Sequence, residues 1–275
     1  MSPVDDQEDL TRKQRREQAR EQRKALEEAS AAEASQRKRL IQLGGVAAVV
    51  IVIIAVILVA TGSGGSKKAP APASPEAKSA QTTVTSLLQG IPQSGTTLGN
   101  PNAPVTIQYF GDLECPICKE FTLGALPTLI QKYVRTGKVK IEYNSMETAT
   151  REKETFQTQQ VSAMAAGKQN LGWNYIELFY HEQGEEDSGY VTESYLQGLA
   201  AQVPGLNLTN WSAARNDPEY ANRVISDAQA ANRVGFTGTP SFLIGKTGGS
   251  MQKLEYASLT DPASFEAAIE KQLKG

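Results

Sequence analysis

A long apolar run near the start of the chain sets the organisation of everything that follows it. Between Arg39 and Lys67 there is no charged residue, and the stretch LGGVAAVVIVIIAVILVA, residues 43–60, is nearly all aliphatic. A helix needs roughly 20 such residues to cross the hydrocarbon core of a bilayer. A core helix of a soluble protein would show a polar stripe, and this run shows none. We therefore predict a single transmembrane helix over residues 40–61.

A cleaved signal peptide is the competing interpretation of the same run. Small residues near Ala60 and Gly62 could form a peptidase site. The run is longer than the usual apolar region of a signal peptide, roughly 7 to 15 residues, and a long segment precedes it. These two features favour an uncleaved anchor.

The basic residues beside the run predict its orientation. Three basic residues, 37–39, adjoin it on the N-terminal side, whereas Lys67 and Lys68 stand several residues beyond its other end. An excess of Lys and Arg marks the cytoplasmic side of a membrane segment. Residues 1–39 are therefore predicted to be a cytoplasmic charged tail, and everything after the anchor is predicted to be extracytoplasmic.

The charge of the chain argues against nucleic acid as a partner. The tail alternates acidic and basic residues, as solvated helices do, and the whole chain has a net charge of −2. A near-neutral protein gains little from counterion release when it meets a polyanion. We expect no nucleic-acid partner.

Residues 62–90 have the composition of a flexible linker. The segment contains GSGGSKKAPAPASPEAKSAQ, which is rich in Gly, Ser, Pro and Ala and has no aromatic residue. The remaining residues, 91–275, have the length of one domain.

Hydrophobic patterning predicts an α/β core for that domain. VTIQYF, residues 105–110, is a compact strand-forming run, and residues 119–137 repeat apolar residues at helical spacing until Gly137. KVKIEYNSM, residues 138–146, predicts a second strand. Together these three segments form a strand-helix-strand unit.

The rest of the domain is predicted to be a helical block followed by a short return to strands. Residues 152–234 are mostly helical in character, with interruptions at 181–189 and 203–210. Two strands follow at 241–245 and 251–257, and DPASFEAAIEKQLKG closes the chain as a helix. The helical block therefore looks inserted into the α/β core.

The sequence CPIC holds the only two cysteines of the chain, Cys115 and Cys118, with Pro116 and Ile117 between them. It lies at the junction between the first strand and the helix. Free N–H groups at a helix start stabilise a thiolate, and Pro116 suits the first helical turn because it has no N–H to lose. We predict that Cys115 is the nucleophile and that Cys118 attacks mixed disulfides formed by Cys115.

A metal site and a structural disulfide are the two other possible uses of the cysteine pair. A metal site needs more soft ligands than the chain offers, since the one histidine, His181, lies far away in sequence. A structural disulfide across two residues closes too small a loop to stabilise the fold much. A reactive dithiol is the remaining interpretation. We expect no metal and no separate cofactor.

Three separated segments in a fixed order resemble one known family. LGNPNAPVTIQYFGDLECPICKEF, GWNYIELFYHEQG and VGFTGTPSFLIG together resemble the DsbA-like thiol-disulfide oxidoreductases of the thioredoxin superfamily, over roughly residues 96–275. The resemblance implies a thioredoxin fold with a helical insertion. It also implies that Thr239-Pro240 is a cis dipeptide that faces the disulfide and pairs with an extended substrate strand.

The chain departs from that family at two places. Thioredoxins and many relatives carry a buried acid six residues before the first cysteine, and Tyr109 stands there. That acid assists proton transfer to the second cysteine, so here another group, or water, must assist proton transfer to Cys118. The dipeptide between the cysteines also lacks the histidine of the most oxidising members. Asp112 and Glu114, if close, are expected to raise the pKa of Cys115.

Other conspicuous side chains have structural explanations. His181 is expected to lie at the surface or to pack, without a redox role. The aromatic residues of the helical block are expected to form its core: Trp173, Tyr175, Phe179 and Tyr180.

The resemblance and the topology together predict a membrane-anchored, extracytoplasmic enzyme that introduces disulfides into reduced exported proteins. A membrane reoxidant of the DsbB or vitamin K epoxide reductase-like kind is then implied as its partner. A thiol reductase or isomerase, for example in cytochrome maturation, remains an alternative. From another class, a non-catalytic thioredoxin-fold binding module would not need both cysteines and Thr239-Pro240.

Overall fold

The computed structural model describes residues 74–274. Within that range, no helix has both the length and the apolar character needed to cross a membrane. The predicted tail, 1–39, and the predicted anchor, 40–61, lie outside the described residues.

A six-stranded sheet organises the described part of the chain, in the order β1-β2-β4-β3-β5-β6. Its two central strands, β3 and β4, run parallel from the Val105↔Val139 pair to the Gly111↔Ser145 pair, as the predicted strand-helix-strand unit requires. All other neighbours are antiparallel. The strands are β1 (Gln93–Ser94), β2 (Thr97–Leu98), β3 (Val105–Gly111), β4 (Val139–Ser145), β5 (Ser241–Lys246) and β6 (Gln252–Lys253).

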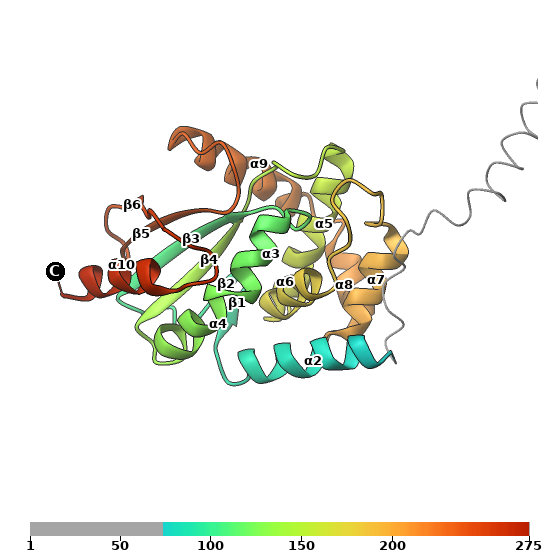
Figure 1. The fold of residues 1–275 in the computed structure, drawn as a ribbon. Coiled ribbons are helices and arrows are strands. Elements are labelled where there is room, and N and C mark those ends of the chain that lie inside the picture. The colour runs from blue at the N-terminus through green and yellow to red at the C-terminus, as the bar shows by residue number, and fades with distance from the viewer. Residues whose placement is uncertain (1–73, 275) are drawn as a thin grey trace, which may run out of the picture. The chain divides into compact units, whose positions relative to one another are not determined.

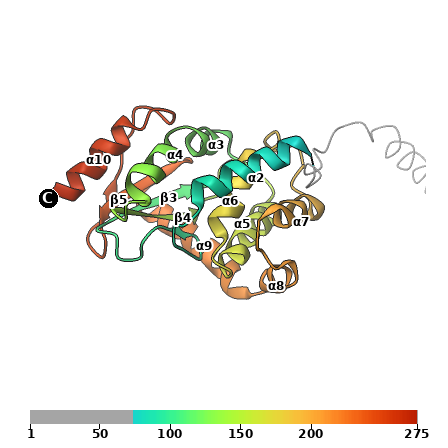
Figure 2. The same ribbon diagram turned by 90° about the horizontal axis from the view of Figure 1, so that it is seen from below.

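Strand β3 is buried on both faces because helices cover both sides of the sheet. Ile107 and Tyr109 face the larger core, which includes Phe265 of α10 (Ala263–Lys274). Phe110 faces the other way, into a small cluster with Ala231 of α9 (Pro218–Arg233). Figures 1 and 2 show α9 on one side of the sheet and α3, α4 and α10 on the other.

The predicted insertion is confirmed as a helical block between β4 and β5. It consists of α5 (Lys153–Gly167), α6 (Gly172–His181), α7 (Glu193–Gln202), α8 (Leu208–Ala214) and α9. The breaks between α6 and α7 and between α7 and α8 coincide with the two predicted interruptions. The aromatic residues named above on α6 are fully buried.

The same helix buries Glu177, whose carboxyl has no hydrogen-bond partner, and burial raises its pKa to about 8.

The prediction of a flexible linker over 62–90 is wrong for its second half. Residues Pro75–Leu88 form helix α2, which starts with a Ser74 cap and Pro75 in the first turn. Val84 and Leu88 are buried in the main core, and α2 packs against α6. The Thr and Ser residues of this segment are modest helix formers, so the helix depends on tertiary contacts that the local composition does not show.

The single helix predicted after the cysteines is three segments: α3 (Pro116–Leu123), α4 (Ala125–Leu129) and a π-helical stretch, Ile130–Val134. The break falls at Gly124, where another part of the backbone crosses closely. A Cβ atom there would lie 2.8 Å from the Thr260 Cα atom, and the neighbouring Ala125 N–H donates to the Leu259 carbonyl. Strand β6 is also shorter than the predicted 251–257.

Candidate active site: a dithiol at the start of helix α3

Cys115 caps the N-terminus of α3, and Pro116 occupies the first helical turn. The Cys115 sulfur accepts a hydrogen bond from the Cys118 N–H at 3.4 Å. Pro116 and Ile117 are exposed between the two cysteines, with Ile117 45% exposed. Both thiols are free, and Cys118 is fully buried one turn behind Cys115. The structure therefore places CPIC at the strand-to-helix junction that the sequence predicted.

The structure brings Thr239 to Cys115 from 124 residues away. The Cys115 sulfur lies 3.5 Å from the Thr239 carbonyl oxygen, to which the thiol donates. The Thr239–Pro240 peptide bond is cis. This is the juxtaposition that the family resemblance implied, formed where the chain leaves α9 and enters β5.

The two thiols have opposite pKa shifts. The pKa of Cys115 is lowered to about 6, mainly by a hydrogen bond with the Cys118 side chain and also by one with the Thr239 side chain, against the effect of burial. The pKa of Cys118 is raised well above its usual value, mainly by burial. A thiolate is thus available at Cys115 near neutral pH, whereas Cys118 holds its proton.

Asp112 is fully buried three residues before Cys115. Its carboxylate accepts hydrogen bonds from three successive backbone N–H groups, those of Thr148, Ala149 and Thr150, at 2.9 to 3.0 Å. The pKa of Cys115 is low in spite of this neighbouring acid. The rise expected from nearby acids is not among the main causes of the Cys115 pKa shift, in which hydrogen bonds prevail.

Glu114 is also buried, and its pKa is raised to about 7. Burial is the main cause, and the negative charges of Asp112, Asp187 and Glu186 add to it. The residue directly before the nucleophile therefore exchanges its proton near neutrality. Asp187 and Glu186, which add to the rise, lie in the loop between α6 and α7.

Tyr109 replaces the buried acid of other family members with an aromatic packing residue. Its ring contacts those of Phe121, Tyr143 and Phe242, with centroids 5.2 to 5.3 Å away. Its hydroxyl donates to the Tyr180 hydroxyl at 3.2 Å, which in turn donates to a backbone carbonyl. No carboxylate stands at this position, and the pKa of Cys118 is raised mainly by burial.

A cavity of about 520 Å³ adjoins the cis peptide. It is lined by residues 235–242 and 253–256, including the rings of Phe236 and Tyr256. The Tyr256 hydroxyl donates to the Pro240 carbonyl at 3.1 Å. A substrate strand that pairs with Thr239 would lie at the mouth of this cavity. Sequence reasoning missed both aromatic residues, because nothing in their local pattern links them to CPIC.

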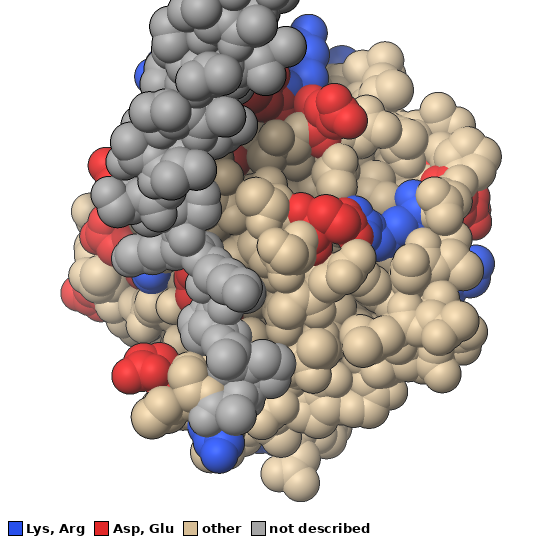
Figure 3. Space-filling model, turned by 90° about the vertical axis from the view of Figure 1, so that its right-hand side faces the viewer, with Lys and Arg blue, Asp and Glu red and all other residues tan. Residues whose placement is uncertain are grey.

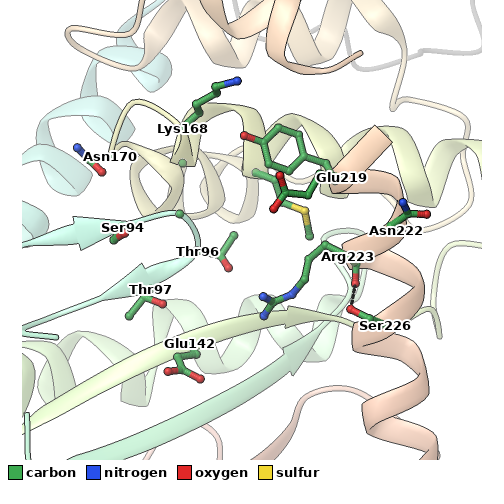
Figure 4. A pocket seen from close by; sticks show the side chains of 14 residues that line it. Ser94, Thr96, Thr97, Glu142, Lys168, Asn170, Glu219, Asn222, Arg223 and Ser226 are labelled. Atoms are coloured by element: carbon green, nitrogen blue, oxygen red, sulfur yellow. Dashed lines mark hydrogen bonds between the residues drawn. The ribbon is translucent and has the colours of Figure 1, made fainter. Parts of the chain in front are cut away.

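A larger cavity, about 740 Å³, lies elsewhere. It is lined by the β1–β2 hairpin, Glu142 of β4, and the facing parts of α5 and α9, with the Arg223 side chain reaching into it (Figure 4). None of its lining residues is a cysteine, Thr239 or Pro240. The cavity near the cis peptide, although smaller, is the one that adjoins the redox chemistry.

Residues 74–274 show no evident metal site. No group of three or more His, Cys, Asp and Glu side chains there is placed to hold a metal ion. The face shown in Figure 3 carries acidic and basic side chains interspersed among other residues, where grey atoms do not cover it. His181, at the end of α6, is partly buried, and burial and the charge of Lys119 lower its pKa.

Comparison with known proteins decides the family. The family model described as thioredoxin matches residues 93–271, which include the dithiol and the cis dipeptide. The chain belongs to the thioredoxin family. The resemblance to its DsbA-like oxidoreductases is confirmed by the relatives described next.

The curated relatives include disulfide bond formation proteins from Bacillus. The probable disulfide bond formation protein D of Bacillus anthracis is 24% identical over 184 residues, covering 64% of this chain and 77% of that protein. The disulfide bond formation protein D of Bacillus subtilis is 22% identical over 183 residues, covering 65% and 77%.

Among solved structures, oxidised BdbD of Bacillus subtilis aligns with a TM-score of 0.56 and 21% identity, covering 67% of this chain and 97% of that one. Wolbachia pipientis alpha-DsbA1 aligns with a TM-score of 0.54 and 20% identity, covering 68% and 92%. These structures share the thioredoxin fold with its helical insertion.

Proposed function

We propose that this thioredoxin-family oxidoreductase introduces disulfides into reduced proteins outside the cytoplasm. The observation that carries the proposal is the Cys115 thiol, whose pKa is lowered to about 6 at the start of α3 and which faces the Thr239 carbonyl. A stable thiolate is a good leaving group, so Cys115 is readily released from a mixed disulfide when a second substrate thiolate attacks that disulfide. The names of the Bacillus relatives support the same direction.

In the proposed reaction, a substrate thiolate attacks the Cys115 sulfur of the Cys115–Cys118 disulfide. The S–S bond breaks, and Cys118 leaves with the electron pair and takes up a proton. A second substrate thiolate then attacks the substrate sulfur of the mixed disulfide and releases Cys115 as a thiolate. The substrate loses two electrons and two protons. Cys118 retains one proton, and the other goes to solvent.

Thr239 gives the substrate its place beside Cys115. Its backbone lies at the edge of the dithiol, where an extended peptide can form main-chain hydrogen bonds as an added strand. The aromatic rings of Phe236 and Tyr256 in the adjoining cavity offer apolar contact for substrate side chains. Exported proteins that are still unfolded expose both kinds of partner.

Turnover requires a reoxidant for the reduced dithiol. We propose a membrane protein of the DsbB or vitamin K epoxide reductase-like kind, which would accept two electrons through a mixed disulfide with Cys115. A reductase or isomerase would instead need an electron donor, and a binding module would need neither cysteine. The low pKa of Cys115 favours the oxidase over these alternatives.

Peptide oxidation tests the direction of the reaction. The full chain, purified in detergent and oxidised, should form one disulfide per molecule in a reduced two-cysteine peptide at neutral pH. The matched Cys115→Ser variant should form none. An equilibrium mixture that leaves the peptide reduced would contradict the oxidase proposal and favour the reductase.

The proposed location is the cell membrane, with the chain crossing once at residues 40–61 and its N-terminus in the cytoplasm. The apolar run and its basic flank support this topology. In intact cells, a membrane-impermeant maleimide should label reduced Cys115. If labelling occurs only after lysis, the orientation is wrong, and if the mature chain lacks residues 1–61, the anchor is cleaved.

A further inference from the structure

The loop after β4 contacts the cis-peptide segment through Thr148, which belongs to none of the motifs described above. The Thr148 hydroxyl is hydrogen-bonded to the Thr239 hydroxyl, and either can be the donor. Thr239 in turn lowers the pKa of Cys115 through a side-chain hydrogen bond. Thr148 is exposed, so its hydroxyl is not needed to satisfy a buried group.

Asp112 fixes the loop that carries Thr148. One carboxylate oxygen accepts the backbone N–H groups of residues 148–150, at 3.0, 2.9 and 2.9 Å. The other accepts the Thr150 hydroxyl at 2.7 Å, the Glu114 N–H at 3.1 Å and the Gln159 side-chain amide at 3.3 Å. A fully buried carboxylate cannot give up these donors without a large desolvation cost. The loop is therefore held in one place relative to the end of β3.

We propose that Thr148, anchored through Asp112, is a positioning residue that holds the Thr239 hydroxyl against the Cys115 sulfur. This inference rests on the proposed function, because it assigns a role in the same reaction. The hydrogen bond between the Thr148 and Thr239 hydroxyls connects the loop after β4 to the cis-peptide segment. Asp112 connects the same loop to the end of β3, three residues before Cys115.

The position of Thr148 also places it at the edge of the substrate site. The residue is exposed beside Thr239, whose backbone carbonyl already contacts Cys115. Loss of the hydroxyl pair would free Thr239 to adopt other side-chain rotamers, and the Cys115 thiolate would lose a fixed donor. The result would be slower release of Cys115 from the mixed disulfide with substrate and less thiolate in the reduced protein.

Thr148→Val tests this role, since it removes the hydroxyl and keeps the shape and the backbone N–H that Asp112 holds. We expect peptide oxidation to slow about fivefold, as befits one lost hydrogen bond. We also expect the pH midpoint for alkylation of Cys115 in the reduced protein to rise. Thr148→Ser, which retains the hydroxyl, should restore both. Wild-type rate and midpoint in Thr148→Val would overturn the proposal.

Thr260→Val is the matched control. The Thr260 hydroxyl also pairs with another hydroxyl, that of Ser258 at 3.2 Å, but near Gly124 at the far end of α3. It should leave the rate and the midpoint unchanged, and an equal effect there would overturn the proposal.

Asp112→Asn supplies a second readout. Amide hydrogen exchange at residues 148–150 should accelerate in this variant, and unchanged exchange would contradict the anchoring role of Asp112. The alkylation midpoint needs no substrate, so it tests Thr148 even if the wild-type protein does not oxidise peptides. Failure of the positioning role and failure of the oxidase function are therefore distinguishable.

Discussion

Replacing Cys118 by alanine will leave Cys115 locked in mixed disulfides with exported proteins and will abolish disulfide transfer. Cys115 has the low pKa and is 5% exposed, whereas Cys118 is fully buried and its pKa is raised. The Cys115 thiolate can still attack a disulfide of an exported protein, and without Cys118 no thiol of the enzyme can then resolve the mixed disulfide. Diagonal electrophoresis of trapped complexes, separated before and after reduction, would measure the effect.

Two controls sharpen this experiment. The Cys115→Ala variant should trap nothing, and complexes formed through Cys118 instead would reverse the assignment of nucleophile and resolving thiol. The Cys118→Ser variant retains a side-chain donor beside Cys115, whose main pKa-lowering partner is the Cys118 side chain. It should trap complexes at lower pH than Cys118→Ala does.

The reduced protein will gain stability relative to the oxidised protein as the pH rises from about 6 towards 9. The pKa of Cys115 is about 6 in the folded state against an ordinary value near 9. Between these values the unfolded chain binds more protons, so raising the pH favours the folded, reduced form. A shift of this size corresponds to at most about 4 kcal/mol. Above pH 9 the trend reverses, because the unfolded chain ionises Cys118 and the folded protein does not.

Urea denaturation of both redox forms at several pH values would measure this difference in the free energy of unfolding. Glu177 titrates in both forms, so its contribution cancels in the comparison. The Cys115→Ser variant, compared with the reduced wild type, should lack the rise between pH 6 and 9. A flat difference in the wild type would mean that the Cys115 thiolate is not stabilised by the fold, and the case for a strongly oxidising disulfide would lose its physical basis.

Local signals in the sequence were enough to predict the core of the fold and the reactive dithiol. The strands over 105–110 and 138–146 have compact apolar patterns, and their pairing follows from the short helical connection between them. Cys115 and Pro116 stand at a helix start that residues next to them specify. The cis dipeptide at Thr239 was implied by family resemblance, since its partner lies 124 residues away.

Features that depend on distant contacts were not predictable in the same way. Helix α2 is stabilised by its contact with α6, and the break at Gly124 by the backbone of residues 259–260. The role inferred for Thr148 needs the Asp112 carboxylate, which lies just after the end of β3. Nothing in the pattern around Thr148 distinguishes it from an ordinary loop residue.

Helix α2 limits how far the enzyme could work from its proposed anchor. A linker over residues 62–90 could extend roughly 100 Å, whereas residues 62–74, which remain once α2 joins the domain, reach at most roughly 45 Å. A shorter tether confines the dithiol to a thinner layer above the membrane and raises its effective concentration towards a reoxidant in the same bilayer. Helix α2 would thus favour rapid reoxidation of the dithiol over access to substrates farther from the membrane.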